Sequence, residues 1–223
     1  MKSTQLVQMA VCLFIVAPGR ASLTAAEVYG VVSRPAIVSD QDSEIRRYRD
    51  PVVSPEPAND KRYLGNPRLF SVIQFWSDNL PPATPLRDTL EMVQRSKTFE
   101  PSVLAITPNS VVSFPNLDPF FHNVFSYSKS KQFDLGKYEQ GKTKYVMFEK
   151  PGIIPVFCEI HYSMRAYIHV VETPYFAVSD ENGNFIVHNV PKGIYSIEVW
   201  QEGQPNIKVT ADVSADSTWL ELK

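Results

Sequence analysis

One stretch indicates the fold of this chain: Cys158-Glu-Ile-His-Tyr-Ser-Met164, with the triplet His122-Asn-Val124 upstream of it. A thiolate, two imidazoles and a thioether are the ligands of a blue-copper electron-transfer site, where the thioether is a long, weak axial ligand. Three ligands on one tight loop, and a fourth from a neighbouring strand end, can converge at one end of a β-sandwich. The pattern therefore predicts a copper site on a β-sandwich.

The rest of the chain supports an all-β fold, because short alternating segments follow one another with turn signals between them. The turn Asp180-Glu-Asn-Gly183 is typical of a hairpin. Residues 34–68 are charged and proline-containing, which predicts a long irregular excursion. Residues 86–94 are compatible with a short helix. The expected strands are 27–33, 69–76, 102–107, 110–115, 143–148, 153–157, 165–172, 175–179, 184–188, 193–200, 205–212 and 217–222.

The N-terminus has the pattern of a secretory signal over residues 1–26. Lys2 precedes a mostly apolar run from Leu6 to Val16, and Thr24-Ala-Ala26 is a small-residue cleavage site. A cut after Ala21 is an alternative. The apolar run is shorter than the ~20 residues of a membrane span. We therefore expect a periplasmic or otherwise exported protein with no stable membrane insertion, the alternative being an uncleaved anchor.

Charge and cysteine content narrow the function further. Loss of Lys2 and Arg20 with the signal takes the formal net charge from −2 to −4, so the product has no basic footprint for nucleic acid. The signal also removes Cys12 and leaves Cys158 as the one cysteine. A lone thiol in an oxidising compartment is a liability unless something occupies it. A histidine follows Cys158 after three residues and a methionine after six. This spacing favours Cys158 as a metal ligand over Cys158 as an inert buried cysteine.

Residues 99–172 resemble the plastocyanin and amicyanin branch of the cupredoxins. The resemblance is carried by Phe114-Pro-Asn116, His122-Asn-Val-Phe-Ser126, Lys150-Pro-Gly152 and Phe157-Cys-Glu-Ile-His-Tyr-Ser-Met164. It implies a Greek-key sandwich that holds one type 1 copper ion. The ligands that it implies are His122, Cys158, His161 and Met164.

The resemblance also assigns roles around the ligands. It implies that Asn123 ties the two ligand segments together. Amicyanins place a proline after the second histidine, where this chain has Tyr162, so the stiffness of the loop and the reduction potential stay open. Pro119, Phe120 and Phe121 predict an apolar rim where a redox partner docks beside His161. We expect at least one of the two phenylalanines to pack in the core.

Other metal centres fit less well. The four histidines are too few for a trinuclear oxidase cluster, and the catalytic copper of a nitrite reductase needs a three-histidine set. His169 and His188 are expected at the surface or at an interface. Zinc accepts cysteine and histidine but has little use for a thioether. Met164 therefore favours copper, and zinc gains ground if Met164 belongs only to the core.

The C-terminal part has a second resemblance, carried by the turns Asp180-Glu-Asn-Gly-Asn-Phe185 and Pro191-Lys-Gly-Ile-Tyr195. These resemble the carboxypeptidase regulatory-like, transthyretin-type β-sandwich. Residues 27–85 are expected to contribute opening strands to this small sandwich, residues 86–172 to form the cupredoxin domain and residues 173–223 to complete the small sandwich. The cupredoxin is then inserted in, or lies next to, the small domain. The arrangement is similar to bacterial exported proteins of the plastocyanin-like or methylamine-utilisation type.

We therefore expect a one-electron carrier rather than an enzyme, with cytochrome-type or dehydrogenase-type redox proteins as partners. Two alternatives stay open at this point. One is a copper carrier or storage protein that uses the same ligands without redox cycling. The other is a structural or interaction module whose copper site is vestigial, since a fold does not by itself determine a function.

Overall fold

The computed structural model describes residues 25–33 and 70–223, which contain strands and turns but no helix, so the all-β prediction is confirmed. None of these residues forms a helix long and apolar enough to cross a membrane. The predicted excursion at 34–68 and most of the predicted signal lie outside the described residues. The strands are β1 (Ala25–Val32), β2 (Ser71–Trp76), β3 (Leu90–Glu91), β4 (Val93–Arg95), β5 (Thr98–Glu100), β6 (Val103–Ile106), β7 (Ser110–Pro115), β8 (Phe125–Tyr127), β9 (Gln132–Asp134), β10 (Thr143–Phe148), β11 (Gly152–Phe157), β12 (Arg165–Val170), β13 (Phe176–Val178), β14 (Asn184–Pro191), β15 (Gly193–Gln201), β16 (Ile207–Val213) and β17 (Ser217–Leu222).

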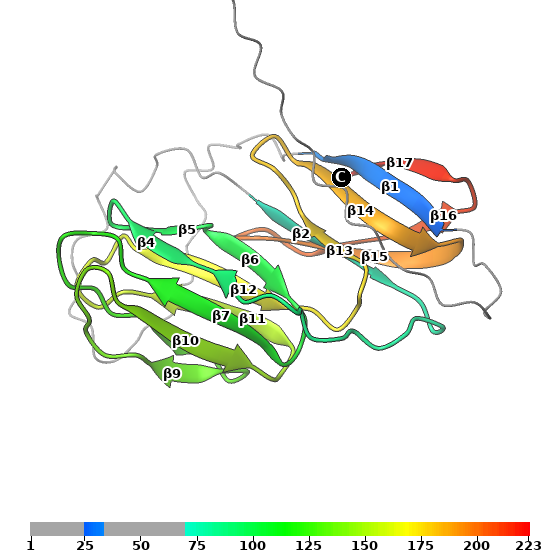
Figure 1. The fold of residues 1–223 in the computed structure, drawn as a ribbon. Helices are drawn as coiled ribbons and strands as arrows, with labels where there is room; N and C mark the ends of the chain where they lie inside the picture. The colour runs from blue at the N-terminus through cyan, green and yellow to red at the C-terminus, as the bar shows by residue number, and fades with distance from the viewer. Residues whose placement is uncertain (1–24, 34–69) are drawn as a thin grey trace, which may run out of the picture.

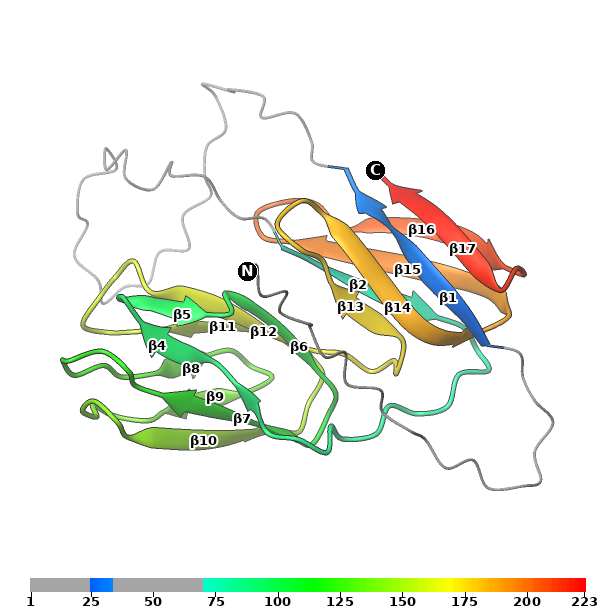
Figure 2. The ribbon, with the colours of Figure 1, turned by 45° about the horizontal axis from the view of Figure 1, so that its top comes forward.

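Strands β3 to β12 form a larger sandwich. One sheet has the order β10-β7-β3, and the facing sheet has the order β6-β12-β11-β8-β9. The hairpin β4-β5 lies beside β7. Large side chains that include Phe114, Phe148 and Ile154 fill the space between the sheets and are fully buried. Both views in Figures 1 and 2 show this sandwich next to a second one.

The second, smaller sandwich is made from both ends of the described chain. Its sheets have the orders β14-β1-β17 and β13-β2-β15-β16. Strand β1 runs parallel to β17, with Glu27 opposite Ser217 and Val32 opposite Leu222. The larger sandwich follows β2 and precedes β13 in the chain. It is therefore inserted between strands of the smaller one.

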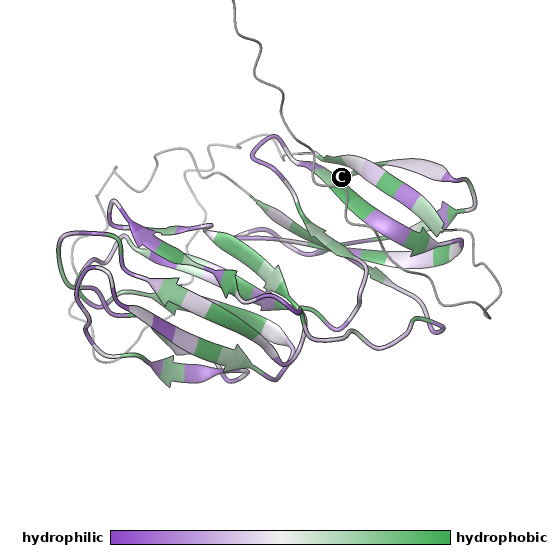
Figure 3. Cartoon of the chain, in the orientation of Figure 1, coloured by the Kyte–Doolittle hydropathy of each residue, from purple (hydrophilic) through white to green (hydrophobic). Residues whose placement is uncertain are grey.

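Strand β1 illustrates why these segments form strands. Its side chains alternate between exposed and buried, with Ala26, Val28 and Val32 almost fully buried. Figure 3 shows the same banding of hydrophobic and hydrophilic residues along the strands of both sandwiches. Gly30 is required in the middle of β1, because a Cβ there would lie 2.1 Å from the Leu220 carbonyl oxygen. The alternation and the glycine together determine which face of β1 packs on the core.

A separate apolar cluster joins the two sandwiches. Trp200 of β15 packs on Tyr167 and His169 of β12, with ring centroids 5.1 and 5.6 Å apart. Val72 of β2 and Ala105 of β6 belong to the same cluster. Strand β12 leaves the 158–164 loop and enters this interface directly. The predicted ligand loop is therefore one strand away from the contact between the sandwiches.

The suggestion of a helix over residues 86–94 was wrong. The segment instead contains β3 and the start of β4, and Leu90 and Glu91 pair in parallel with Val112 and Ser113 of β7. Met92 is fully buried in the larger core between the two short strands. Apolar residues at 86, 90 and 93 have helical spacing, but pairing with β7 overrides this weak local preference.

Candidate metal centre

Three of the predicted ligands lie together in the structure. The Cys158 Sγ lies 3.7 Å from the His122 Nδ1 and 3.9 Å from the His161 Nδ1, and the two nitrogens are 3.0 Å apart. Metal–nitrogen bonds of ~2.0–2.1 Å and metal–sulfur bonds of ~2.3 Å place neighbouring ligand atoms roughly 3–4 Å apart. The donor atoms are therefore spaced to hold one ion.

Two chain segments present these atoms. His122 is held by a bridge to Tyr138, in which each backbone N–H donates to the other residue's carbonyl, at 3.2 and 2.8 Å. The other segment joins the end of β11 to the start of β12. Its Cys158 N–H donates to the Met164 carbonyl at 3.3 Å, and the Met164 N–H donates to the His161 carbonyl at 2.9 Å. These bonds close the loop and bring its ends together.

The cluster is mostly shielded from water. The His122 side chain is fully buried, Cys158 is 3% exposed, and Met164, on the same loop as Cys158, is buried in the larger core. His161 is only partly buried and gives the cluster its one edge toward solvent. Burial, followed by the nearby His122, lowers the pKa of His161 below its usual range. A neutral imidazole is the form that binds a metal ion.

Asn123 connects the two ligand segments. Its Oδ1 accepts a hydrogen bond of 2.7 Å from the backbone N–H of Glu159, the residue that follows Cys158. The Asn123 side chain is buried and Glu159 is exposed, so this bond is partly shielded from water. The contact therefore ties Glu159, which follows Cys158, to Asn123, which follows His122.

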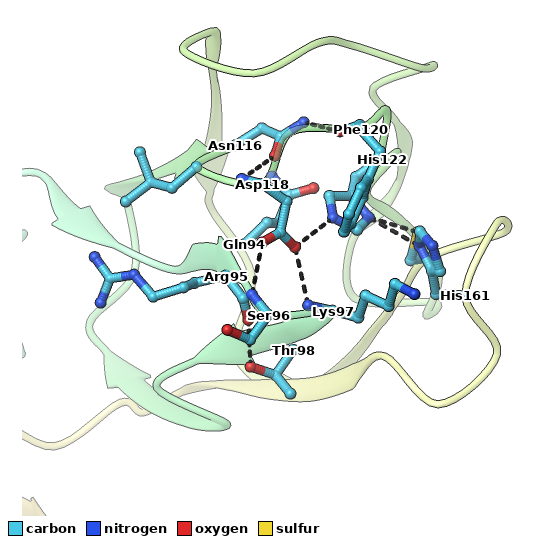
Figure 4. Close-up of polar contacts among 12 residues, drawn as sticks. Gln94, Arg95, Ser96, Lys97, Thr98, Asn116, Asp118, Phe120, His122 and His161 are labelled. Atoms are coloured by element: carbon cyan, nitrogen blue, oxygen red, sulfur yellow. Dashed lines mark hydrogen bonds and ion pairs between the residues drawn. The ribbon is translucent and has the colours of Figure 1, made fainter.

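Asp118 is a member of the site that sequence reasoning missed. Its Oδ2 lies 2.8 Å from the His122 Nε2, on the side of the ring away from the cluster (Figure 4). Burial raises its pKa, but N–H donors from Lys97 and Ser96 and the His122 ring more than offset this, and the pKa lies below its ordinary value. The sequence signal for Asp118 was its place four residues before His122. It also lies two residues after Asn116, which belongs to the motifs of the family resemblance.

The predicted rim is present at the exposed edge. Phe120 and Phe121 are 37% and 55% exposed, which contradicts the expectation that one of them packs in the core. The Phe120 ring instead packs on the rings of His122 and His161, with centroids 5.4 and 5.6 Å apart. Phe120 therefore lies at the surface but keeps ring contacts with both imidazoles. Pro119 is exposed beside them.

The other two histidines lie away from the cluster. His169 is buried at the interface against Trp200. His188 is at the surface of the smaller sandwich, where its Nδ1 lies 2.6 Å from the Glu27 Oε2. Among the described residues, His122, Cys158 and His161 are the one group of three or more candidate ligands within 4.8 Å.

Fold and site together define a two-sandwich β protein with a buried His–Cys–His cluster. No protein-family model matches the chain, and no curated protein matches it. Solved structures do: a purple cupredoxin from Nitrosopumilus maritimus is 19% identical over 37% of this chain and 99% of its own, with a TM-score of 0.34. A reduced amicyanin variant is 15% identical over 44% of this chain and 98% of its own, with a TM-score of 0.36.

A copper-containing nitrite reductase from Thermus scotoductus is also similar. It is 25% identical over 44% of this chain but only 25% of its own length, with a TM-score of 0.37. Of these three structures, the nitrite reductase is described as containing copper. At these identities and TM-scores they do not assign a function, and the choice of metal depends on the ligand chemistry of the cluster.

Proposed function

We propose that the protein is a type 1 copper protein that carries single electrons between redox partners. One observation supports this most strongly: a thiolate and two imidazoles are spaced for one ion, with a buried thioether on the same loop. Soft sulfur ligands suit Cu(I), imidazoles suit Cu(II), and the combination is typical of blue-copper sites. The bound ion would supply one-electron chemistry, with His122, Cys158, His161 and Met164 as its ligands.

The residues around the cluster suit this role. Core packing and the closed 158–164 loop hold the ligand atoms in place and exclude water. The partly exposed His161 and the apolar rim of Pro119, Phe120 and Phe121 form the surface where a partner would dock. Electron-transfer encounters are small and weak, so a few exposed side chains are enough. We propose cytochrome-type or dehydrogenase-type proteins as partners, and an exported location.

The first test is an absorption spectrum of the purified protein after Cu(II) is added. The proposal predicts an intense blue thiolate-to-copper band with one ion per chain, and its loss in Cys158→Ser. His188→Gln is the matched control, because it removes an imidazole outside the cluster, and it should keep the band. A wild-type protein that stays colourless, or that holds zinc in preference to copper, would exclude the proposal.

Electron transfer needs its own measurement. A carrier should give reversible one-electron voltammetry with fast exchange, since its ligands need little movement between the two oxidation states. A copper carrier or storage protein uses the same four ligands but does not need fast exchange. A blue protein with slow, irreversible voltammetry would therefore favour the storage alternative over the electron carrier.

A further inference from the structure

We propose that Asp118 is a positioning residue of the metal centre, which orients His122 and favours the oxidised form of the bound ion. The inference rests on the proposed copper function and concerns the same site. It differs from the ligand assignment because Asp118 would act through the His122 ring and not by binding the ion. The hydrogen bond between the Asp118 Oδ2 and the His122 Nε2 carries the argument.

The carboxylate determines which ring nitrogen of His122 is free. An ionised carboxylate only accepts hydrogen bonds, so the Nε2 must carry the proton in this contact. The Nδ1 then presents its lone pair toward the Cys158 Sγ and the His161 Nδ1, at 3.7 and 3.0 Å. A hydrogen-bonded carboxylate behind a metal-binding imidazole fixes the ring and raises its basicity. His122 is therefore prepared for a metal before the metal arrives.

The position of Asp118 is itself fixed by the turn between β4 and β5. The Ser96 N–H donates to the Asp118 Oδ1 at 2.7 Å, and the Lys97 N–H donates to the Oδ2 at 2.9 Å. Both residues have the positive φ angles, 53° and 58°, of a two-residue hairpin turn. This conformation points two successive backbone N–H groups at one carboxylate, as Figure 4 shows.

Asn116 holds Asp118 from the other side. The Asn116 Oδ1 accepts from the Asp118 backbone N–H at 3.0 Å, and its Nδ2 donates to the Phe120 and Tyr138 carbonyls at 2.9 and 3.0 Å. Tyr138 is the backbone partner of His122. The hydrogen bonds of Asn116 therefore also support the backbone of His122, through Tyr138. Asn116 thus fixes the backbone of Asp118 and the turn fixes its carboxylate, which leaves the carboxylate little freedom to turn away from the ring.

The charge of Asp118 has an electrostatic consequence. The carboxylate is 5% exposed, and among the described residues its ion pair is with His122 rather than with a lysine or arginine. A buried negative charge that water screens weakly interacts more favourably with the more positive of two ions. Asp118 should therefore stabilise the oxidised copper relative to the reduced copper and lower the reduction potential.

The decisive variant is Asp118→Asn, which removes the charge and keeps the shape. Changes to such supporting groups typically cost tenfold or more in metal affinity, and we expect this loss to fall mainly on Cu(II), so that the preference of the site for Cu(II) over Cu(I) falls about tenfold. Tenfold corresponds to a rise in potential of about 59 mV for one electron. Asp180→Asn is the matched control, because Asp180 also accepts two backbone N–H bonds in a turn but touches no histidine. A Cu(II)-over-Cu(I) preference in Asp118→Asn within twofold of that in this control would overturn the proposal.

A second measurement needs no metal. The ¹⁵N chemical shifts of the His122 ring in the metal-free protein report which nitrogen carries the proton. We expect the Nε2–H form in the wild type and a mixture of both forms in Asp118→Ala. A proton on the Nδ1 in the wild type would overturn the inference. A wild type that binds no copper would instead remove the proposed function, so the two failures are distinguishable.

Discussion

Buried polar side chains around the cluster show how single residues prepare the site. Asn123 and Asp118 each make a hydrogen bond that joins segments far apart in the chain: Asn123 to Glu159, and Asp118 to the 96–97 turn. Truncation of either side chain leaves a partly buried backbone N–H without its acceptor. The loss of such a partner destabilises the fold by more than the net contribution of the hydrogen bond to stability. The geometry of the His–Cys–His cluster therefore depends on residues outside the cluster.

Asn123→Ala tests this at one position. The variant leaves the Glu159 N–H without its acceptor, and we expect the free energy of unfolding of the metal-free protein to fall by ~1–3 kcal/mol. Urea unfolding of the wild type and the variant measures the difference. Asn206→Ala is the control, since the exposed Asn206 makes only a 3.4 Å contact with Glu198, and it should change stability little. Equal losses in the two variants would contradict a special role for Asn123.

The grouping of His122, Cys158 and His161 could be predicted from the sequence because Cys158 and His161 lie three residues apart and the motifs around all three residues are recognisable. The support from Asp118 could not be predicted in the same way. It depends on a turn at residues 96 and 97 that lies in a different hairpin, and whose two left-handed residues are a serine and a lysine rather than the usual asparagine and glycine. Only the fold brings that turn to the carboxylate.

At the scale of elements, hydrophobic alternation located most of the strands. Long strands such as β14 and β15 alternate from Asn184 to His188 and from Ile194 to Val199, which is enough to define a period of two. Strands β5, β8 and β9 have three residues each and were missed. Three residues cannot display a period. Their pairing comes from neighbours that the sequence alone does not identify.

Strand β1 makes a prediction about signal processing. It begins at Ala25, and Ala25 and Ala26 pair with Pro191 and Val190, although the sequence placed both residues in the signal. Ala26 is 1% exposed. Cleavage after Ala26 would remove a buried side chain and two paired residues from the smaller sandwich. We therefore expect cleavage after Ala21, which the intact mass of the mature protein will show. A mature chain that begins at Glu27 would contradict this.

For the whole molecule, the interface between the sandwiches contains a buried histidine. His169 is 6% exposed, packs on Trp200, and has no hydrogen-bond partner for its Nδ1 among the described residues. Burial lowers its pKa to about 4, and Glu198 opposes this only in part. A cation at this position would be poorly solvated. The interface is therefore suited to the neutral imidazole.

The pH dependence of stability follows from this histidine. Its pKa is lower in the folded protein than the value of ~6.5 in an unfolded chain, so the unfolded state binds more protons between pH 4 and 6.5. Stability is thus complete above pH 6.5 and falls as the pH falls toward 4. Between pH 7.5 and pH 5 we expect this one group to cost roughly 2 kcal/mol.

Urea unfolding of the metal-free protein at the two pH values measures the loss. His169→Leu should lose about 2 kcal/mol less than the wild type over this range, because its interface holds no group that titrates. His188→Leu, at an exposed histidine, is the control, and the pH-dependent loss of stability should not become smaller in this variant. The prediction is wrong if His169→Leu keeps the full pH dependence of the wild type.

The pairing of β1 with β14 and β17 also determines the order in which the molecule can be completed. Ribosomes and export channels deliver a chain from its N-terminus. Strands β3 to β12 are contiguous, so they can pair as soon as residue 170 has emerged. Strands β1 and β2 are delivered first, but their partners β13, β14, β15 and β17 all follow residue 170. The sandwich with the His–Cys–His cluster can therefore be assembled while β1 and β2 still have open edges, and the later strands complete the smaller sandwich.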